Sequence, residues 1–174
     1  KDQLQPELSS FLIKGHTMAA NEILEKIAEH PYHIALDNFV WGSNSDILNQ
    51  AYILCVAHKL TGEEKYLAGA EQITDYIFGK NATGYSFFTG FGSKRVMFPH
   101  HRPSGADGID DPVPGFVIGG PNIDRQDSGD VDYTSDFPAK AYMDVEPSFA
   151  SNEVCINWNA PAVYVLGYLE QNRK

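Results

Sequence analysis

The sequence has few of the features that identify disulfide-rich, membrane-spanning or nucleotide-binding proteins. It has only two cysteines, Cys55 and Cys155, and no CxxC pair of the kind found in zinc or redox sites. No apolar run approaches the ~20 residues that a membrane helix needs. A GxSxG motif and a phosphate-binding glycine loop are also missing. We expect two buried free thiols, although the sequence leaves a disulfide between them open.

Basic residues are scarce as well. The chain has 13 Lys and Arg against 23 Asp and Glu, so its formal net charge is −10 and its pI is near 4.9. This balance argues against nucleic acid and anionic membranes as partners, and is compatible with a neutral polysaccharide. With 43% hydrophobic and 21% charged residues in 174, the composition is typical of one globular domain.

Three stretches repeat apolar residues at helical spacing: Met18–Glu29, Asp46–Leu60 and Glu64–Phe78. Apolar residues nearly encircle the second stretch, which predicts an inner, buried helix. Ser45 is its expected N-cap and Gly62 its expected C-cap. A helix, a glycine-containing turn and a second helix form a helical hairpin.

Periodicity is lost over residues 80–151, which contain most of the glycines and prolines. Such long irregular stretches are usually functional when they occur inside a compact domain. Short strands are expected at Phe87–Thr89 and Phe116–Ile118. Near the N-terminus, Ser9–Lys14 allows either a short helix or a strand-like lead-in.

The last predicted helix contains Ala162–Leu169 and starts near Asn157 or Asn159. This start places Pro161 in the first turn, where proline is tolerated. It also leaves Glu153 in front of the helix. A helix N-terminus would favour the ionised form of its carboxyl group.

The stretch from 141 to 160 concentrates groups suited to hydrolysis of a glycosidic bond. It reads AYMDVEPSFASNEVCINWNA, with Asp144 and Glu153 nine residues apart among aromatic and amide side chains. Glycoside hydrolysis uses one carboxylic acid to protonate the leaving oxygen and a second carboxylate to activate water or attack the sugar.

This stretch resembles the second signature of glycoside hydrolase family 9, the family of many endoglucanases. The matching residues are Tyr142, Asp144, Phe149, Glu153, Asn159 and Ala160. Cys155 departs from the pattern, because the family usually has Ser, Thr or Ala there. Cysteine is similar in size and tolerates burial, so the departure is small.

A second stretch, SFFTGFGSKRVMFPHHR over 86–102, resembles the histidine signature of the same family. The matching residues are Ser86, Phe88, Thr89, Gly92, Lys94, Pro99, His100 and Arg102. The segment PVPGFVIGGPN over 112–122 also resembles the connection between the two signatures. If the chain is extended at HHRP, His100 and Arg102 face one side and His101 the other.

The resemblance covers roughly residues 15–171 and implies an all-α fold, the C-terminal portion of an (α/α)6 barrel with about four helices. Residues 1–174 would then form a partial catalytic domain. The resemblance implies that Glu153 is the general acid, that Asp144 and His100 belong to the active centre, and that Arg102 binds substrate. Aromatic residues such as Phe91 and Trp158 are candidates for stacking on sugar rings, and Trp41 is a similar open case.

The resemblance also implies that the reaction inverts the anomeric carbon. The family's catalytic base is an Asp in an N-terminal motif that no part of this sequence matches. We therefore predict that the chain alone is inactive and works with an N-terminal remainder of its catalytic domain. Activity of the purified chain that disappears in Glu153→Gln would contradict this. The family implies a secreted or periplasmic protein.

Two other functions fit the sequence. One is an exo-acting enzyme of the same family, such as a glucosaminidase, and the other is a non-catalytic carbohydrate-binding remnant. No cofactor is indicated. The acidic run Asp124, Asp127, Asp130 and Asp132 has the oxygen density for Ca²⁺ without EF-hand spacing, and a solvated loop is the favoured interpretation.

Overall fold

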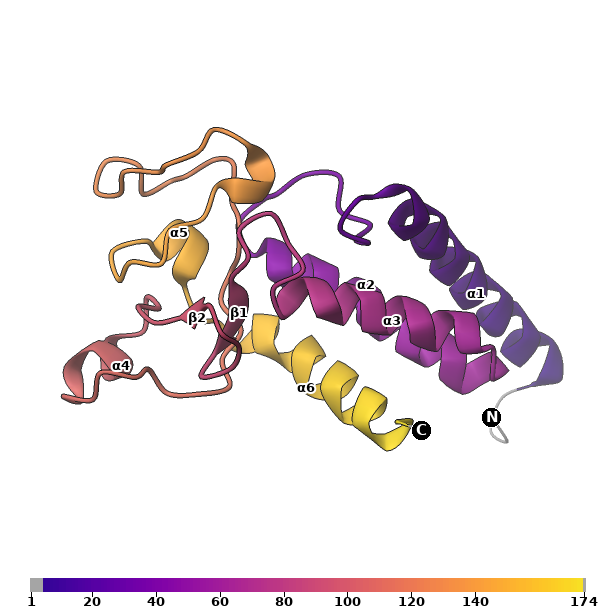
Figure 1. Ribbon diagram of the computed structural model, residues 1–174. Coiled ribbons are helices and arrows are strands. Elements are labelled where there is room, and N and C mark those ends of the chain that lie inside the picture. The colour runs from indigo at the N-terminus through magenta and orange to yellow at the C-terminus, as the bar shows by residue number, and fades with distance from the viewer. Residues whose placement is uncertain (1–4, 174) are drawn as a thin grey trace.

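The structure, a computed structural model, describes residues 5–173 and separates a helical part from a loop region (Figure 1). The helical part consists of α1 (Pro6–Glu29), α2 (Ser43–Thr61), α3 (Glu64–Ile77) and α6 (Ile156–Gln171). The loop region contains β1 (Ser86–Thr89), β2 (Arg95–Val96), α4 (Arg102–Ala106), the 3₁₀ helix η1 (Pro138–Lys140) and α5 (Phe149–Asn152). The expected four long helices are therefore confirmed.

Helix α2 is the centre of the helical part. It contacts α1, α3 and α6, and its apolar side chains Ile47, Leu48 and Leu54 are fully buried. Because apolar residues surround α2 on nearly all sides, it can be covered by three neighbours at once. The prediction of an inner helix is confirmed.

The first turn of α2 differs from the prediction. The helix begins at Ser43 after Gly42, which is left-handed at φ +82°, so Ser45 is not the N-cap. The Ser43 hydroxyl donates to the Pro121 carbonyl at 2.7 Å, and the Asn44 amide donates to Ile118 at 2.9 Å. These bonds to the loop region explain the early start. At the other end, the predicted C-cap Gly62 is confirmed at φ +75°.

Helix α1 is longer than predicted and continues upstream to Pro6. Its added turns carry Leu8, Phe11 and Leu12, which keep helical spacing although their side chains are exposed. Gly15 interrupts the apolar pattern and has low helix propensity, which is why the pattern alone predicted a start at Met18. The stretch left open between helix and strand is helical.

Helix α6 begins at Ile156, so the prediction that Pro161 lies in the first turn is wrong. Pro161 lies in the second turn, where it lacks the N–H that would bond the carbonyl of Asn157. Asn157 is exposed, so water can satisfy that carbonyl. Glu153 precedes the helix, as predicted, and has extended backbone angles of φ −71° and ψ 149°.

Strands β1 and β2 pair in parallel, and the expected strand at Phe87–Thr89 is confirmed. The strand expected at Phe116–Ile118 is not continuous. Val117 bridges to Phe88, whereas Ile118 bridges to Val154. The segment therefore passes between two partners and pairs with each through one residue.

Both cysteines are free thiols, but only Cys55 is fully buried. Burial raises the pKa of the Cys55 thiol to about 12. Cys155 is half-buried at the start of α6, so the expectation of two buried thiols holds for one of them.

Among residues 5–173, no helix is long and apolar enough to cross a membrane.

We predict that Gly120→Ala destabilises the fold by about 2–4 kcal/mol. Gly120 has φ +87°, and a Cβ there would lie 2.4 Å from the buried Asn44 side chain. Gly115 also has a positive φ, but a Cβ added there would have no atom within 4 Å. A Cβ added at Gly129 would meet no atom within 4 Å either, and the φ of Gly129 is not in the left-handed range. Urea unfolding of the three variants should rank them in that order, and equal midpoints would contradict the account.

Candidate active site

Three extended segments from distant parts of the sequence meet at Glu153. The His100 N–H donates to the Asn152 carbonyl at 2.8 Å, and His100 and Glu153 form a parallel bridge. On the other side, the Gly119 N–H donates to the Glu153 carbonyl at 2.9 Å. The two sequence signatures, about 50 residues apart, are thus side by side.

The Glu153 carboxyl group is half-buried and makes no hydrogen bond or ion pair with any other residue in the described range 5–173. Its backbone is held on both sides, so its position is fixed while its oxygens remain available. A carboxyl group that is fixed in position and unpartnered can exchange a proton with a bound molecule.

Unlike the Glu153 carboxyl group, the Asp144 carboxylate accepts several hydrogen bonds from the protein. One oxygen accepts the Met97 N–H and the other the Phe98 N–H, both at 2.9 Å. The Asn152 side-chain amide lies 3.3 Å from the second oxygen. Asp144 therefore holds the segment that leads into His100.

Asn152 links this carboxylate to a buried tyrosine. Its amide donates to the Phe98 carbonyl at 2.6 Å, and its oxygen accepts the Tyr142 hydroxyl at 3.0 Å. Burial, and then the negative charge of Asp144, raises the pKa of Tyr142 well above its usual value. Tyr142 therefore remains a hydrogen-bond donor across the ordinary pH range.

His100 has a defined tautomer. Its Nδ1 lies 2.7 Å from the Glu146 carbonyl, and a carbonyl can only accept, so Nδ1 carries the proton. In the neutral ring Nε2 is then an acceptor, and within residues 5–173 it has no partner. The ring also lies 6.2 Å from Phe149, centroid to centroid.

The extended chain predicted at HHRP ends before Arg102, which is the first residue of α4. Pro103 explains this, because its fixed φ suits the first turn of a helix. Arg102 is exposed and has no ion-pair partner among the described residues. His101 is structural, since it bonds the Ser104 hydroxyl at 2.9 Å and packs on Phe116.

The two aromatic residues named from the sequence lie in different surroundings. Phe91 is 53% exposed in the turn between β1 and β2. The Trp158 indole packs against Gly42 and Gly119, where an added Cβ would lie 2.8 Å and 3.0 Å from it. Trp158 therefore joins α6 to α2 and the loop region, and a sugar contact by either residue stays a prediction.

Trp41 is an aromatic residue whose place the sequence left open. Its ring lies 5.6 Å from Phe149, which in turn contacts His100, and 40% of Trp41 is exposed. It comes directly before Gly42, whose left-handed backbone turns the chain into α2.

The acidic run is only partly the solvated loop that was expected. Asp124, Asp130 and Asp132 are exposed, but Asp127 is 2% exposed. Its carboxylate accepts hydrogen bonds from Tyr133, Ser148 and the Ala150 N–H. These donors explain its burial.

Among the described residues, no group of three or more His, Cys, Asp and Glu side chains has the arrangement of a metal site.

The sequence profile of glycosyl hydrolase family 9 matches residues 6–166. The chain is 40% identical to a xyloglucan-specific endo-β-1,4-glucanase of Bacteroides ovatus, over 97% of this chain and 28% of the relative. It is 35% identical to a cellulose 1,4-β-cellobiosidase of Acetivibrio thermocellus, over 88% of this chain and 18% of the relative.

A solved structure, AaCel9A in complex with cellobiose-like isofagomine, superposes with a TM-score of 0.85 at 35% identity. The match covers 96% of this chain and 33% of that one, so the chain spans a third or less of these relatives. As predicted, the helices correspond to part of the family's (α/α)6 barrel. With a profile match over nearly its whole length and relatives that share its fold, the chain belongs to glycosyl hydrolase family 9.

Proposed function

We propose that the protein hydrolyses β-1,4-linked glucans and that this chain supplies the general acid, Glu153. One observation carries the proposal: backbone pairing places Glu153 beside His100 and leaves its carboxyl group without a protein partner. The names of the relatives support the substrate class, because both describe enzymes that act on β-1,4-linked glucans.

In the proposed reaction Glu153 donates its proton to the glycosidic oxygen as the bond to the sugar breaks. A second carboxylate, on the opposite face of the sugar, removes a proton from the attacking water, and the anomeric carbon inverts. We place that base in an N-terminal remainder of the catalytic domain, outside these 174 residues.

The remaining groups would bind and orient the sugar. Nε2 of His100 would accept a hydrogen bond from a sugar hydroxyl, and Arg102 would donate to sugar oxygens from the start of α4. Phe91, Trp158 and Trp41 are candidates for stacking on pyranose faces. Because polymeric glucans and their longer fragments do not cross the cytoplasmic membrane, we further propose that the protein works in a secreted or periplasmic location.

Exo action is the second candidate, and the cellobiosidase among the relatives favours it. Endo action lowers the viscosity of a soluble glucan early and yields mixed oligosaccharides. Exo action releases one short product while the viscosity changes slowly. The product profile over time therefore decides between them.

We predict that Glu153→Gln lowers kcat on cellotetraose about 100- to 10,000-fold in the catalytic domain that contains this chain. The amide keeps the shape of the side chain but has no proton to donate. Dinitrophenyl cellobioside, whose leaving group needs no protonation, should lose far less. Glu170→Gln, at the far end of α6, is the matched control. Equal losses on both substrates would refute the assignment of Glu153 as the acid.

We predict that Asp144→Asn lowers both stability and turnover. An amide has one accepting atom, so the N–H of Met97 or Phe98 loses its partner, at about 1–3 kcal/mol. The segment that leads into His100 is then held at one point instead of two, and kcat should fall with it. Urea unfolding and steady-state kinetics measure the two effects, with the exposed Asp132→Asn as control. Full stability in Asp144→Asn would contradict the positioning role.

A further inference from the structure

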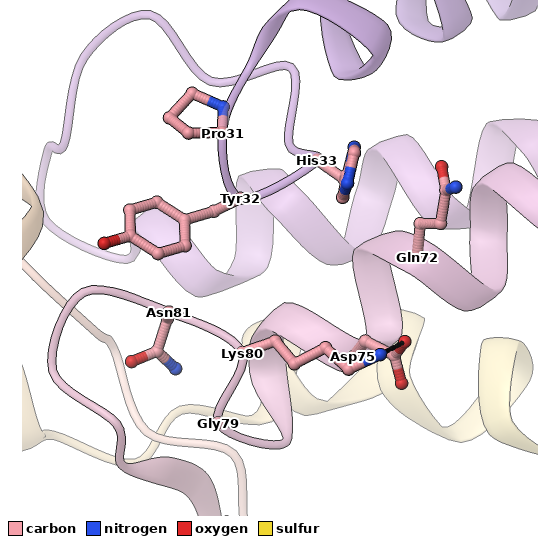
Figure 2. Close-up of a pocket in the computed structure, with 8 residues that line it drawn as sticks. All are labelled: Pro31, Tyr32, His33, Gln72, Asp75, Gly79, Lys80 and Asn81. Atoms are coloured by element: carbon pink, nitrogen blue, oxygen red, sulfur yellow. Dashed lines mark hydrogen bonds and ion pairs between the residues drawn. The ribbon is translucent and has the colours of Figure 1, made fainter.

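A pocket of about 460 Å³ lies between the turn that follows α1 and the C-terminal end of α3 (Figure 2). Its volume falls in the range of about 300–1,000 Å³ that is typical of small-molecule sites. None of its residues belongs to the candidate active site. Its lining includes the side chains of Tyr32, His33, Gln72, Asp75, Lys80 and Asn81.

The charges in this pocket cancel. The Lys80 ammonium group lies 2.5 Å from an Asp75 carboxylate oxygen, so neither charge is free to attract an ion. Figure 2 shows this pair along one side of the pocket, with Gln72 beyond it. A neutral ligand is therefore favoured over an anion or a cation.

The pocket offers both hydrogen-bond donors and acceptors. Nδ1 of His33 donates to the Ile27 carbonyl at 3.0 Å, which leaves Nε2 as an acceptor in the neutral ring. The exposed Gln72 amide supplies a donor and an acceptor, and within residues 5–173 it has no hydrogen-bond partner. A ligand with several hydroxyl groups, each able to donate and accept a hydrogen bond, would match the His33 and Gln72 side chains.

The Tyr32 ring gives the pocket an apolar surface. Figure 2 shows Tyr32 and Asn81 toward one end, and Gln72 and Asp75 toward the other. Aromatic rings can stack on the C–H faces of polyhydroxylated rings and cover their apolar side. An aromatic surface at one end and amide and imidazole groups beyond it suit an elongated ligand.

His33 is held in an unfavourable backbone conformation. Its φ of +53° lies in the left-handed region, which only a few per cent of non-glycine residues adopt, although histidine does so more often than most. Residues held in this region are found preferentially where a side chain must be placed for binding. Here the turn directs the imidazole into the pocket (Figure 2).

The far wall of the pocket connects to the candidate active site. The Asn81 amide donates to the Tyr85 carbonyl at 2.9 Å, and the Tyr85 ring lies 5.2 Å from Tyr142. Tyr142 in turn donates to Asn152, next to Glu153. The pocket therefore stands at the end of the helices from which the active-site loops extend.

We propose that this pocket is a second glycan-binding site, which holds a neutral segment of the polysaccharide outside the catalytic centre. Its preference for a neutral polyhydroxylated ligand follows from the lining groups, whereas the choice of a β-1,4-glucan rests on the proposed function. A polymer held at both places would stay on the protein, while a short oligosaccharide would gain nothing from the pocket.

The experiment uses the full-length protein with Glu153→Gln, so that the glucan is not consumed, in affinity electrophoresis through gels containing hydroxyethyl cellulose. Combining His33→Asn with Gln72→Ala should weaken the apparent affinity about 3- to 10-fold. Asparagine tolerates the left-handed backbone, and Gln72 is exposed on α3, so both changes suit the fold. Glu71→Ala, the exposed neighbour of Gln72, should show the same retardation as the parent when each is compared with its own migration in a gel without glucan.

The same changes in the protein that retains Glu153 should lower kcat/KM on hydroxyethyl cellulose and leave kcat/KM on cellotetraose unchanged. Unaltered retardation in the double variant would overturn the pocket proposal, and so would an equal effect of Glu71→Ala. Gln72→Ala alone keeps the test valid if thermal unfolding shows that the double variant is unstable. A protein that hydrolyses neither substrate would refute the proposed function, while the electrophoresis still decides on the pocket.

Discussion

The pairing of extended segments around Glu153 is the interaction on which the rest of the candidate site depends. The loop region has few regular elements, so its backbone groups must find partners at long range. Asn152 and Glu153 accept N–H groups from His100 and Gly119, and Ser151 accepts one from Gly120, all within 2.9 Å. These bonds join three loop segments into one surface, and the proposed acid lies in its middle.

A buried polar network fixes this surface from behind. Tyr142, Asn152 and Asp144 satisfy one another and the backbone of Phe98, so few of their polar atoms lack a partner. In a buried network an unpaired group costs about 1–3 kcal/mol, and this nearly complete pairing therefore makes one arrangement more favourable than its alternatives. The same network orients the backbone that carries His100 and Glu153.

The sequence was sufficient to locate the four long helices, though not all their starts, and the two signatures, because periodicity and local motifs depend on neighbouring residues. It failed where a role depends on distant partners. Ser45 had the right chemistry for an N-cap, but Ser43 and Asn44 bind the loop at Pro121 and Ile118 and start the helix earlier. Asp127 looked like its exposed neighbours, and its burial depends on donors at 133, 148 and 150.

Asp144 shows why geometry changes the meaning of a motif. A carboxylate offers about four lone-pair sites, and backbone and amide donors already occupy three of those on Asp144. A catalytic base needs a free oxygen directed at water, so this occupancy favours a positioning role for Asp144. The Glu153 carboxyl group, by contrast, has no donor from the described residues. The two acidic residues of one signature thus differ in their hydrogen bonding, and the proposed inverting reaction would require its base from another part of the catalytic domain.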